Sequence, residues 1–280
     1  MKAKAYAKIN LSLIIKDKKE DGLHYLDSVF HKIDLYDDIE IDENELDKCV
    51  LSCNIKELEE DNLILKAYDL LKKSYKIKGL NVKLNKRIPM QAGLGGGSSD
   101  VATFIKMVND CFHLNMTEKA FRKIGKSLGS DVIPCYYDEP INVHATGYLV
   151  SRIISRMEFN LVVIKPNLEC NTGLMYKKLD EIDNRYIPDI NGFIVQALFY
   201  NDLDLLCKYL FNSFEEVVDC NNIKKDLLDS GAIGALLSGS GSSVFGIYRN
   251  RKEAKKGFEL LNKKYECYLC KSINNHLKKD

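Results

Sequence analysis

The sequence lacks a strong net charge. Its 41 lysines and arginines are balanced by 40 aspartates and glutamates, which leaves a formal charge of +1. A pronounced basic surface is what attracts proteins to nucleic acids and to anionic membranes. We therefore expect neither nucleic acid nor a membrane as a partner.

Long apolar runs and paired cysteine motifs are also missing. The apolar part of residues 9–15 is too short and too strand-like for a signal peptide or a membrane span. The nine cysteines are odd in number, show no CxxC spacing and have no histidine cluster beside them. This pattern disfavours zinc and is typical of thiols in a reducing cytosol. We expect a cytoplasmic protein without a dedicated metal site.

The chain shows no internal repeat, no low-complexity segment and no regular alternation of strands and helices. Its 280 residues, 45% apolar and 29% charged, suit a soluble protein of one large domain or two ordinary ones. Because strands and helices mix irregularly, the predicted class is α+β.

Apolar periodicity predicts the elements of the first half. We expect strands over 3–16, 49–55 and 80–88, and one or two strands over 28–42 with a break near 36–38. Helices are predicted to begin after Asn62, after the glycines at 93–97, and after Thr117. The segment 129–131 ends the last of these helices, and residues 141–150 look extended.

A domain boundary is expected between residues 150 and 160, which divides the chain into domains 1–155 and 156–280. The second domain begins with a short buried-type strand at 161–164. A mostly helical part follows to about residue 230. Residues 232–248 read as strand, small-residue turn and strand, and a last helix begins near Arg251.

The most informative stretch is Pro89-Met90-Gln91-Ala92-Gly93-Leu94-Gly95-Gly96-Gly97-Ser98-Ser99-Asp100, between a predicted strand and a predicted helix. Glycines allow positive φ angles and let a ligand approach the bare backbone. The first N–H groups of the following helix have no partner within it and lie at its positive end. This arrangement favours phosphate binding, with a purely structural turn as the alternative.

The loop fits neither of two common nucleotide motifs. No Gly-Lys-Ser/Thr closes it, so it is not a Walker loop. Its glycine spacing also differs from that of the dinucleotide fingerprint.

Three separated segments together resemble the motifs of the GHMP kinases. They are Ala7-Lys8-Ile9-Asn10-Leu11, the glycine stretch, and Leu237-Ser238-Gly239-Ser240-Gly241. Within that superfamily, Glu20-Asp21-Gly22-Leu23-His24, Asp61-Asn62-Leu63-Ile64 and Gly129-Ser130-Asp131-Val132 resemble one branch. Its members phosphorylate the 2-hydroxyl of 4-diphosphocytidyl-2-C-methyl-D-erythritol in the non-mevalonate route to isoprenoid precursors.

The resemblance implies a two-domain α+β fold, with a ribosomal-protein-S5-like N-terminal domain and a ferredoxin-like C-terminal domain. ATP and substrate would lie in the cleft between them. The implied cofactors are ATP and Mg²⁺, and the implied partner is a small-molecule cytidine diphosphate ester. We expect a monomer or a homodimer.

For catalysis the resemblance implies Lys8 and Asp131. Asp131 would take the proton from the acceptor hydroxyl, and Lys8 would hold that hydroxyl and offset the charge on the transferred phosphoryl group. The alternatives are a solvated strand lysine and a helix-capping aspartate.

The resemblance implies that ATP binds to the glycine loop and to two further residues, Asn62 and Lys86. Asn62 and Lys86 would border the adenine pocket, with a helix cap and a surface lysine at a strand end as alternatives. Asp100 would stabilise the helix start or contact magnesium. The loop positions implied in binding ATP are Pro89, Met90, Gln91, Ala92, Gly93, Leu94, Gly95, Gly96, Gly97, Ser98 and Ser99.

For the acceptor the resemblance implies a set of six residues. His24 would read the cytosine edge, and Tyr176 would pack on the base; a surface histidine and a core aromatic are the alternatives. The remaining implied substrate contacts are Asn10, Thr172, Ser238 and Gly239, the last two in a segment that could also be only a hairpin turn.

Two other functions stay open from the residues. One is a kinase of the same superfamily acting on another small alcohol, such as homoserine or a mevalonate derivative. The other is a nucleotide-binding protein without turnover, against which the presence of both Lys8 and Asp131 argues.

Overall fold

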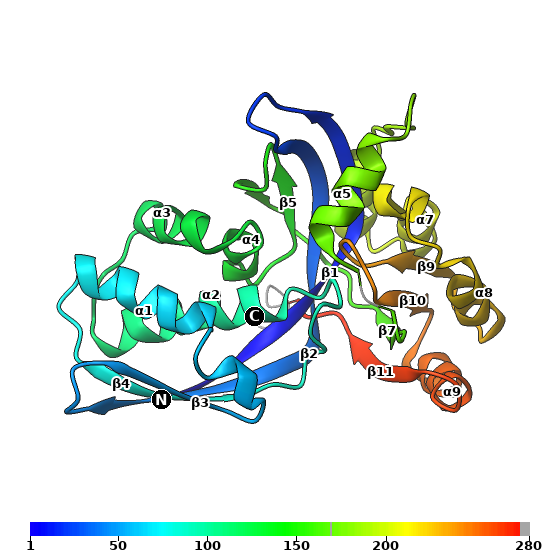
Figure 1. Cartoon of the computed structure of the whole chain (residues 1–280). Coiled ribbons are helices and arrows are strands. Elements are labelled where there is room, and N and C mark those ends of the chain that lie inside the picture. Colours follow the sequence, from blue (N-terminus) through cyan, green and yellow to red (C-terminus); the bar gives the residue numbers. More distant parts are fainter. Residues whose placement is uncertain (169, 275–280) are drawn as a thin grey trace. The chain divides into compact units, whose positions relative to one another are not determined.

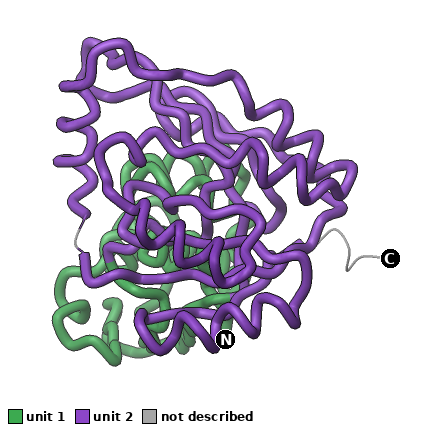
Figure 2. The backbone as a smooth tube through the Cα atoms, turned by 90° about the vertical axis from the view of Figure 1, so that its right-hand side faces the viewer, with its two compact units in different colours: residues 1–7, 35–90, 95–136 green, residues 8–34, 91–94, 137–280 purple. Residues whose placement is uncertain are grey.

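The computed structural model describes residues 1–168 and 170–274. The chain forms two compact units, coloured in Figure 2. The first unit holds residues 1–7, 35–90 and 95–136, and the second holds residues 8–34, 91–94 and 137–280. These units are defined by packing, and the predicted domain boundary near residue 155 stays a prediction.

Strands β1 (Lys2–Lys18) and β2 (His24–Asn44) contribute residues to both units. In the first unit, β4 (Gly79–Asn85) pairs antiparallel with the end of β2, from Asp38 opposite Asn85 to Asn44 opposite Gly79. On its other side β4 pairs in parallel with β3 (Cys49–Cys53). Buried and exposed residues alternate along β4, so one face of the sheet carries the core.

The predicted break in the second strand is wrong, since β2 runs without interruption through residues 36–38. The pattern misled because Asp37 is a charged residue at a buried position. Its side chain is fully buried and accepts hydrogen bonds from the backbone N–H groups of Arg87 and Ile88, at 2.5 and 2.8 Å. A buried carboxylate with such partners is compatible with a continuous strand.

The predicted helices of the first unit are confirmed (Figure 1). They are α1 (Leu63–Ser74), α2 (Gly96–Cys111) and α3 (Glu118–Leu128). Two short helices, η1 (Lys56–Leu58) and α4 (Val132–Tyr136), were not predicted. Asn62 and Thr117 cap α1 and α3, each accepting a hydrogen bond from a backbone N–H of the first turn. Pro134 lies in the first turn of α4, where a proline is tolerated.

The second unit contains a four-stranded antiparallel sheet in the order β11-β7-β10-β9. Counted along the chain, β7 is the first of these strands and β11 the fourth, so the spatial order is 4-1-3-2, as in ferredoxin-like folds. The strands are β7 (Asn160–Lys165), β9 (Gly234–Leu237), β10 (Val244–Tyr248) and β11 (Glu266–Lys271). The predicted α+β class is confirmed, although β11 was not predicted.

Other elements of this unit complete it. The predicted extended segment 141–150 is a hairpin of β5 (Ile141–His144) and β6 (Leu149–Arg152), and β8 (Phe211–Asn212) pairs with β1. The helices are α5 (Thr172–Asp180), α6 (Asn191–Tyr200), α7 (Leu203–Lys208), η2 (Ser213–Glu216), α8 (Asn221–Asp229) and α9 (Arg251–Leu261).

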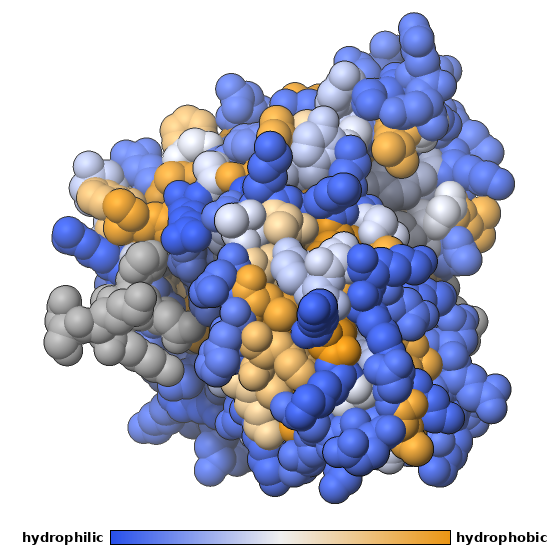
Figure 3. Space-filling view, turned by 90° about the vertical axis from the view of Figure 1, so that its left-hand side faces the viewer, coloured by the Kyte–Doolittle hydropathy of each residue, from blue (hydrophilic) through white to orange (hydrophobic). Residues whose placement is uncertain are grey.

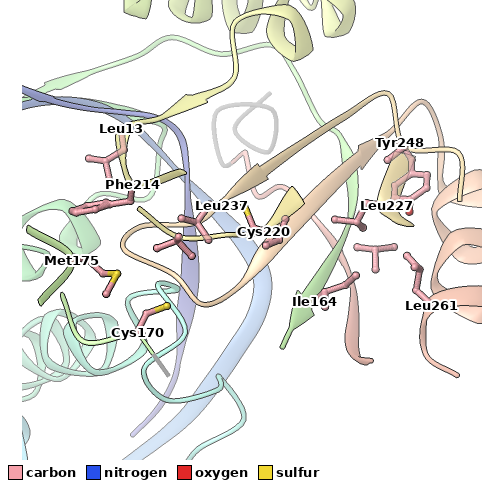
Figure 4. Packing of buried hydrophobic residues seen from close by; sticks show 14 of the residues in the cluster. Leu13, Ile164, Cys170, Met175, Phe214, Cys220, Leu227, Leu237, Tyr248 and Leu261 are labelled. Carbon is pink, nitrogen blue, oxygen red and sulfur yellow. The ribbon is translucent and has the colours of Figure 1, made fainter. Parts of the chain in front are cut away.

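The core of the second unit joins its sheet to the surrounding helices (Figure 4). Leu13 of β1 and Phe214 of η2 belong to the same buried cluster as Leu237 of β9. Each fully buried side chain of this size contributes about 1.5–3 kcal/mol through the hydrophobic effect. This cluster therefore anchors β1 just after the first sequence motif and the end of β9, where the third motif begins.

All nine cysteines are free thiols. No helix in the part of the chain that the structure describes has both the length and the apolar character needed to cross a membrane. The face in Figure 3 is largely hydrophilic, with a smaller hydrophobic area near its centre.

Candidate active site

Lys8 is a buried lysine on β1, with only 4% of its surface exposed. Its ammonium donates a hydrogen bond to Asn10 Oδ1 at 2.7 Å and lies 4.8 Å from the centre of the Phe30 ring. Its backbone N–H donates to the carbonyl of Leu94 at 2.9 Å. The alternative of a solvated strand lysine is therefore wrong.

The turn between β9 and β10 lies against residues 92–94 of the glycine stretch, all within the second unit. Ser238 Oγ donates to the carbonyl of Gly93 at 3.0 Å. The N–H of Ser243 donates to the carbonyl of Ala92 at 3.1 Å. This turn is thus joined to the glycine stretch and is more than a hairpin connection.

Two glycines make this approach possible. Gly93 has a φ of +72°, and a Cβ there would lie 1.9 Å from the carbonyl oxygen of Ser238. Gly239 has a φ of +59°, and its Cβ would lie 3.0 Å from the Gly93 oxygen and 3.4 Å from Lys8 Nζ. Side chains at either position would push the three segments apart. The structure therefore brings Lys8, part of the glycine stretch and the third motif together.

The rest of the glycine stretch begins α2 in the first unit. Gly95 is the N-cap, with a left-handed φ of +68°, and the helix starts at Gly96. Gly97 and Ser98 follow in its first turn, where backbone N–H groups have no partner within the helix. A helix that starts in bare glycines leaves these N–H groups open to an anion.

The other loop positions differ in exposure. Pro89 is half-buried, Met90 is 49% exposed, and Gln91 has a left-handed φ of +51°. Ser99 is buried, and its hydroxyl donates to the carbonyl of Tyr6 at 2.7 Å. The Ser99 hydroxyl is therefore used to hold α2 on β1.

Lys86 belongs to a buried charge cluster, and the alternative of a surface lysine is wrong. The side chains of Lys86, Asp37 and Asp100 are at most 5% exposed. Lys86 Nζ contacts Asp37 Oδ2 and lies 2.7 Å from Asp100 Oδ2. Burial lowers the pKa of Lys86, but the charges of Asp100 and Asp37 outweigh this and raise it.

Asp100 is the carboxylate of this cluster whose environment is least favourable to charge. Burial raises its pKa to about 7, against the opposing attraction of Lys86. Its Oδ1 is buried and has no hydrogen-bond partner among the residues that the structure describes. The ion pair of Asp100 with Lys86 thus connects α2 to the residues that follow β4.

Asn62 and Asn54 complete this edge of the first unit. Asn62 Oδ1 accepts from the N–H of Ile64 at 2.9 Å, so the expected alternative, a helix cap, is present. The Asn54 side chain bonds both backbone groups of Lys86, its N–H at 2.7 Å and its carbonyl at 3.0 Å. These bonds fix the backbone at the end of β4.

Asp131 lies directly before α4, and its carbonyl accepts from the N–H of Cys135 at 3.0 Å. It is partly exposed, while Val132 and Ile133 behind it are buried. Burial of the following residues orients the start of this helix. This position allows either proton transfer or helix capping.

His24 opens β2 and is 8% exposed, so it is not a surface histidine. Its Nε2 lies 2.5 Å from Asp180 Oδ1, and its ring stacks on Tyr176 with centroids 4.9 Å apart and planes at 23°. Tyr176 and Asp180 are four residues apart on α5, so they share a helix face. The opposite contact of Tyr176 is the edge of Phe214, at 5.0 Å between centroids.

The charge on Asp180 settles which nitrogen of His24 carries the proton. Burial raises the pKa of Asp180, but Lys18 at 2.5 Å and His24 hold it below its usual range. A carboxylate only accepts, so Nε2 carries a proton and donates it in a hydrogen bond to Asp180, and in this neutral tautomer Nδ1 would be an acceptor.

The remaining predicted substrate residues lie in the second unit. Thr172 is the first residue of α5 and is exposed; its hydroxyl lies 2.8 Å from that of Ser240 in the turn after β9. Asn10 is 1% exposed and is occupied on both sides, by Lys8 and by Ser28. Thr172 is thus open to a ligand, whereas Asn10 is enclosed.

Within residues 1–168 and 170–274, no group of three or more His, Cys, Asp or Glu side chains is arranged to hold a metal ion. Asp100, the acidic residue nearest the glycine stretch in sequence, is paired with Lys86. The Asp100 carboxylate is therefore engaged in an ion pair rather than arranged as part of a metal site. A magnesium ion brought by ATP would be held chiefly by phosphates and water.

Comparisons with known proteins identify the family of this chain. The model of the GHMP kinases N terminal domain matches residues 62–139, and that of the GHMP kinases C terminal matches residues 194–267. A 4-diphosphocytidyl-2-C-methyl-D-erythritol kinase of Clostridium tetani is 37% identical and covers 98% of this chain and 100% of its own length. The chain belongs to the GHMP kinases.

Further similarities place it within that family. A kinase of the same name from Acetivibrio thermocellus is 36% identical over 96% of this GHMP kinase and 98% of its own chain. A crystal structure of 4-(cytidine 5'-diphospho)-2C-methyl-D-erythritol kinase, 24% identical, superposes with a TM-score of 0.83 over 98% of this chain and 100% of that one. GHMP kinases transfer a phosphoryl group from ATP to an alcohol, so this chain is a phosphotransferase.

Sequence reasoning missed the residues that hold the predicted ones. Asp37, Asp180 and Ser28 had no motif of their own. The one local signal was Asp37, a charged residue within an alternating apolar strand. The other two are recognisable only through partners far away in the chain.

Proposed function

We propose that this GHMP kinase uses ATP to phosphorylate the 2-hydroxyl of 4-diphosphocytidyl-2-C-methyl-D-erythritol, in the non-mevalonate route to isoprenoid precursors. The names and full-length similarity of its relatives support this acceptor. The observation that carries the phosphotransferase role is the packing of Lys8 Nζ against the turn at Gly239, beside Gly93. The proximity of this buried cation to the backbone of the glycine stretch supports a role in phosphoryl transfer.

The proposed reaction is a direct transfer. Asp131 accepts the proton of the 2-hydroxyl, and the hydroxyl oxygen forms a bond to the γ-phosphorus of ATP. The bond from that phosphorus to the bridging oxygen breaks, and ADP leaves with the electron pair. Lys8 and the N–H groups at the start of α2 stabilise charge on the transferred group.

We propose that ATP binds to the glycine stretch and to the residues around Asn62 and Lys86. The open N–H groups of the first turn of α2 would bind phosphate oxygens. Because the Lys86 ammonium is neutralised by two carboxylates, the proposed contact of Lys86 is through its backbone and its stem. Magnesium bound with ATP supplies charge neutralisation of the phosphates.

For the acceptor we propose that His24 and Tyr176 recognise cytosine. Cytosine carries an exocyclic amino group, and Nδ1 of His24 is the acceptor left by the bond to Asp180. Tyr176 offers an aromatic face that now stacks on His24. Ser238, Gly239 and the exposed Thr172 would contact the phosphate-bearing part of the acceptor.

The cellular setting completes the proposal. Nine free thiols and the balanced charge suit the cytoplasm. We propose a monomer or a homodimer, and domains divided near residue 155, each containing one of the two matched family models.

A mass-spectrometric assay with magnesium, ATP and 4-diphosphocytidyl-2-C-methyl-D-erythritol tests the function. The expected product carries one additional phosphate and is lost with Asp131→Asn. Asp204→Asn is the matched control, because Asp204 is a surface carboxylate paired with Arg249 at 2.6 Å; it should retain full activity.

The other outcomes overturn defined parts of the proposal. ATP binding without product contradicts the cytidine acceptor and directs the assay to other small alcohols. Absence of ATP binding contradicts the kinase role altogether. Full activity of Asp131→Asn contradicts the assigned base.

A further inference from the structure

A chain of buried hydrogen bonds leads away from Lys8 into the second unit. Lys8 Nζ donates to Asn10 Oδ1 at 2.7 Å, and Asn10 Nδ2 donates to Ser28 Oγ at 2.8 Å. Ser28 Oγ in turn donates to the carbonyl of Ser12. Asn10 is 1% exposed, and Ser12 and Ser28 are fully buried. Water therefore does not compete for these bonds.

The direction of every bond follows from Lys8. An ammonium has only donors, so the atom of Asn10 that faces it must be the carbonyl oxygen. The amide nitrogen of Asn10 then faces Ser28 and can only donate. The Ser28 hydroxyl accepts this bond and gives its own hydrogen to the Ser12 carbonyl, which can only accept. Only one arrangement of Asn10 satisfies all four groups.

The far end of this chain is itself fixed. Ser12 Oγ accepts from the N–H of Val29 at 3.0 Å and donates to Asn191 Oδ1 at 2.6 Å. Asn191 Nδ2 donates to Asn142 Oδ1 at 3.2 Å. The bonds thus connect β1 and β2 with the first residue of α6 and with β5, so Ser28 lies in a rigid frame.

We infer that Asn10 and Ser28 are positioning residues for Lys8. Ser28 holds the Asn10 amide in one orientation, and Asn10 holds the Lys8 ammonium in one direction. In this role Asn10 acts through Lys8 rather than through the substrate. The inference deepens the proposed function, because it rests on Lys8 as the group that acts on the phosphoryl group.

Ser28→Ala is the sharpest test, since it leaves both Lys8 and Asn10 in place. Without the hydroxyl the Asn10 amide loses its partner, and the bond from the Lys8 ammonium to Asn10 is no longer fixed in one orientation. We expect kcat to fall about tenfold while KM for ATP and for the acceptor changes less than twofold, because small displacements of a positioned group slow the chemical step. Ser28→Cys keeps a weak donor and acceptor and should recover part of kcat.

Ser155→Ala is the matched control. Ser155 is 1% exposed in the same unit, and its hydroxyl bonds the N–H of Met157 at 3.1 Å. This variant loses a buried hydroxyl of the same kind without touching the chain to Lys8. Its kcat should equal that of the native protein. Equal kcat values for Ser28→Ala and Ser155→Ala would overturn the inference.

A double substitution separates positioning from a general loss of structure. In a Lys8→Met background, Ser28→Ala should have no further effect on the residual rate, since the group it positions is gone. A tenfold loss that persists in this background contradicts the inference. Thermal unfolding of each variant confirms that the folded protein is being compared.

NMR of the Lys8 ammonium gives a readout that does not need turnover. Its ¹⁵Nζ order parameter should be high in the native protein, lower in Ser28→Ala and unchanged in Ser155→Ala. If the native protein phosphorylates no alcohol but the order parameters follow this pattern, the proposed function fails and the positioning stands. If the order parameters do not differ, the positioning fails independently of the function.

Discussion

Lys8 and Lys86 are both buried lysines near the glycine stretch, but their surroundings differ in kind. The Lys8 ammonium contacts a neutral amide oxygen and an aromatic face. The Lys86 ammonium contacts two buried carboxylates. The amide oxygen orients the Lys8 ammonium, whereas the two carboxylates neutralise the charge of Lys86. The first arrangement suits action on a phosphoryl group, and the second suits a structural connection.

The largest expected effect separates the two lysines by activity. Lys8→Met should lower kcat by about 10²–10³, the usual cost of losing one group that stabilises charge in the transition state. Its thermal unfolding should change less than that of Lys86→Met, in which two buried carboxylates lose their cation. Steady-state kinetics and calorimetry on the same preparation measure both. A Lys8→Met protein with native kcat would contradict a catalytic role for Lys8 and thus the proposed difference between the two lysines.

Substitution of Lys86 is expected to lower stability rather than to act directly on the chemical step. Lys86→Met leaves Asp37 and Asp100 buried without a cation, which should destabilise the fold by about 3–5 kcal/mol. Urea unfolding followed by circular dichroism measures this loss. Lys8→Met is the matched control, because it also replaces a buried lysine by methionine. A stable Lys86→Met protein would show that the carboxylates do not depend on this lysine.

A smaller effect is expected from the glycine that faces Lys8. Gly239→Ala adds a methyl group near Lys8 Nζ and the Gly93 oxygen, at a φ of +59°. We expect kcat to fall about tenfold through displacement of Lys8, with about 1–2 kcal/mol of backbone strain. Gly231→Ala is the comparison variant, because Gly231 also has a positive φ, of +101°, but nothing lies within 4 Å of the added Cβ. It should lose stability only, and an equal loss of kcat in both variants would contradict the contact with Lys8.

The last expected effect is a pH dependence of the Lys86 cluster, which changes stability gradually and leaves every native residue in place. Burial raises the pKa of Asp100 in the folded state from its ordinary value of 3.8 to about 7. Between these values the folded protein keeps a proton that the unfolded chain has released. The contribution of Asp100 is therefore fully present at low pH and is lost as pH rises to about 7.

Comparison with Asp100→Asn isolates this effect. The native protein should lose stability relative to this variant as pH rises from about 4 to about 7, by at most about 1.4 kcal/mol per pH unit. Asp226→Asn should show the opposite sign, because Lys264 and Tyr265 lower the pKa of Asp226. Urea unfolding at several pH values tests both. A difference from Asp100→Asn that does not vary with pH contradicts the raised pKa.

Much of the local structure could be predicted because it depends on neighbouring residues. The glycines of residues 93–97 permit left-handed angles, and the apolar spacing after them requires a helix; both features are present. The caps at Asn62 and Thr117 were likewise visible from residue type. The break predicted within β2 failed because its cause, the burial of Asp37, depends on Arg87 and Ile88.

The sequence predicted which residues belong to the candidate site, but it did not predict which side chains these residues contact. The sequence alone determined the three motifs, the α+β class and the family resemblance, because these depend on residue type and order. Only the tertiary structure decided that Lys86 pairs with Asp37, 49 residues away, and that His24 pairs with Asp180, 156 residues away. Burial and hydrogen bonding of a charged side chain depend on what folding places beside it, and residues so far apart leave no periodic pattern in the chain.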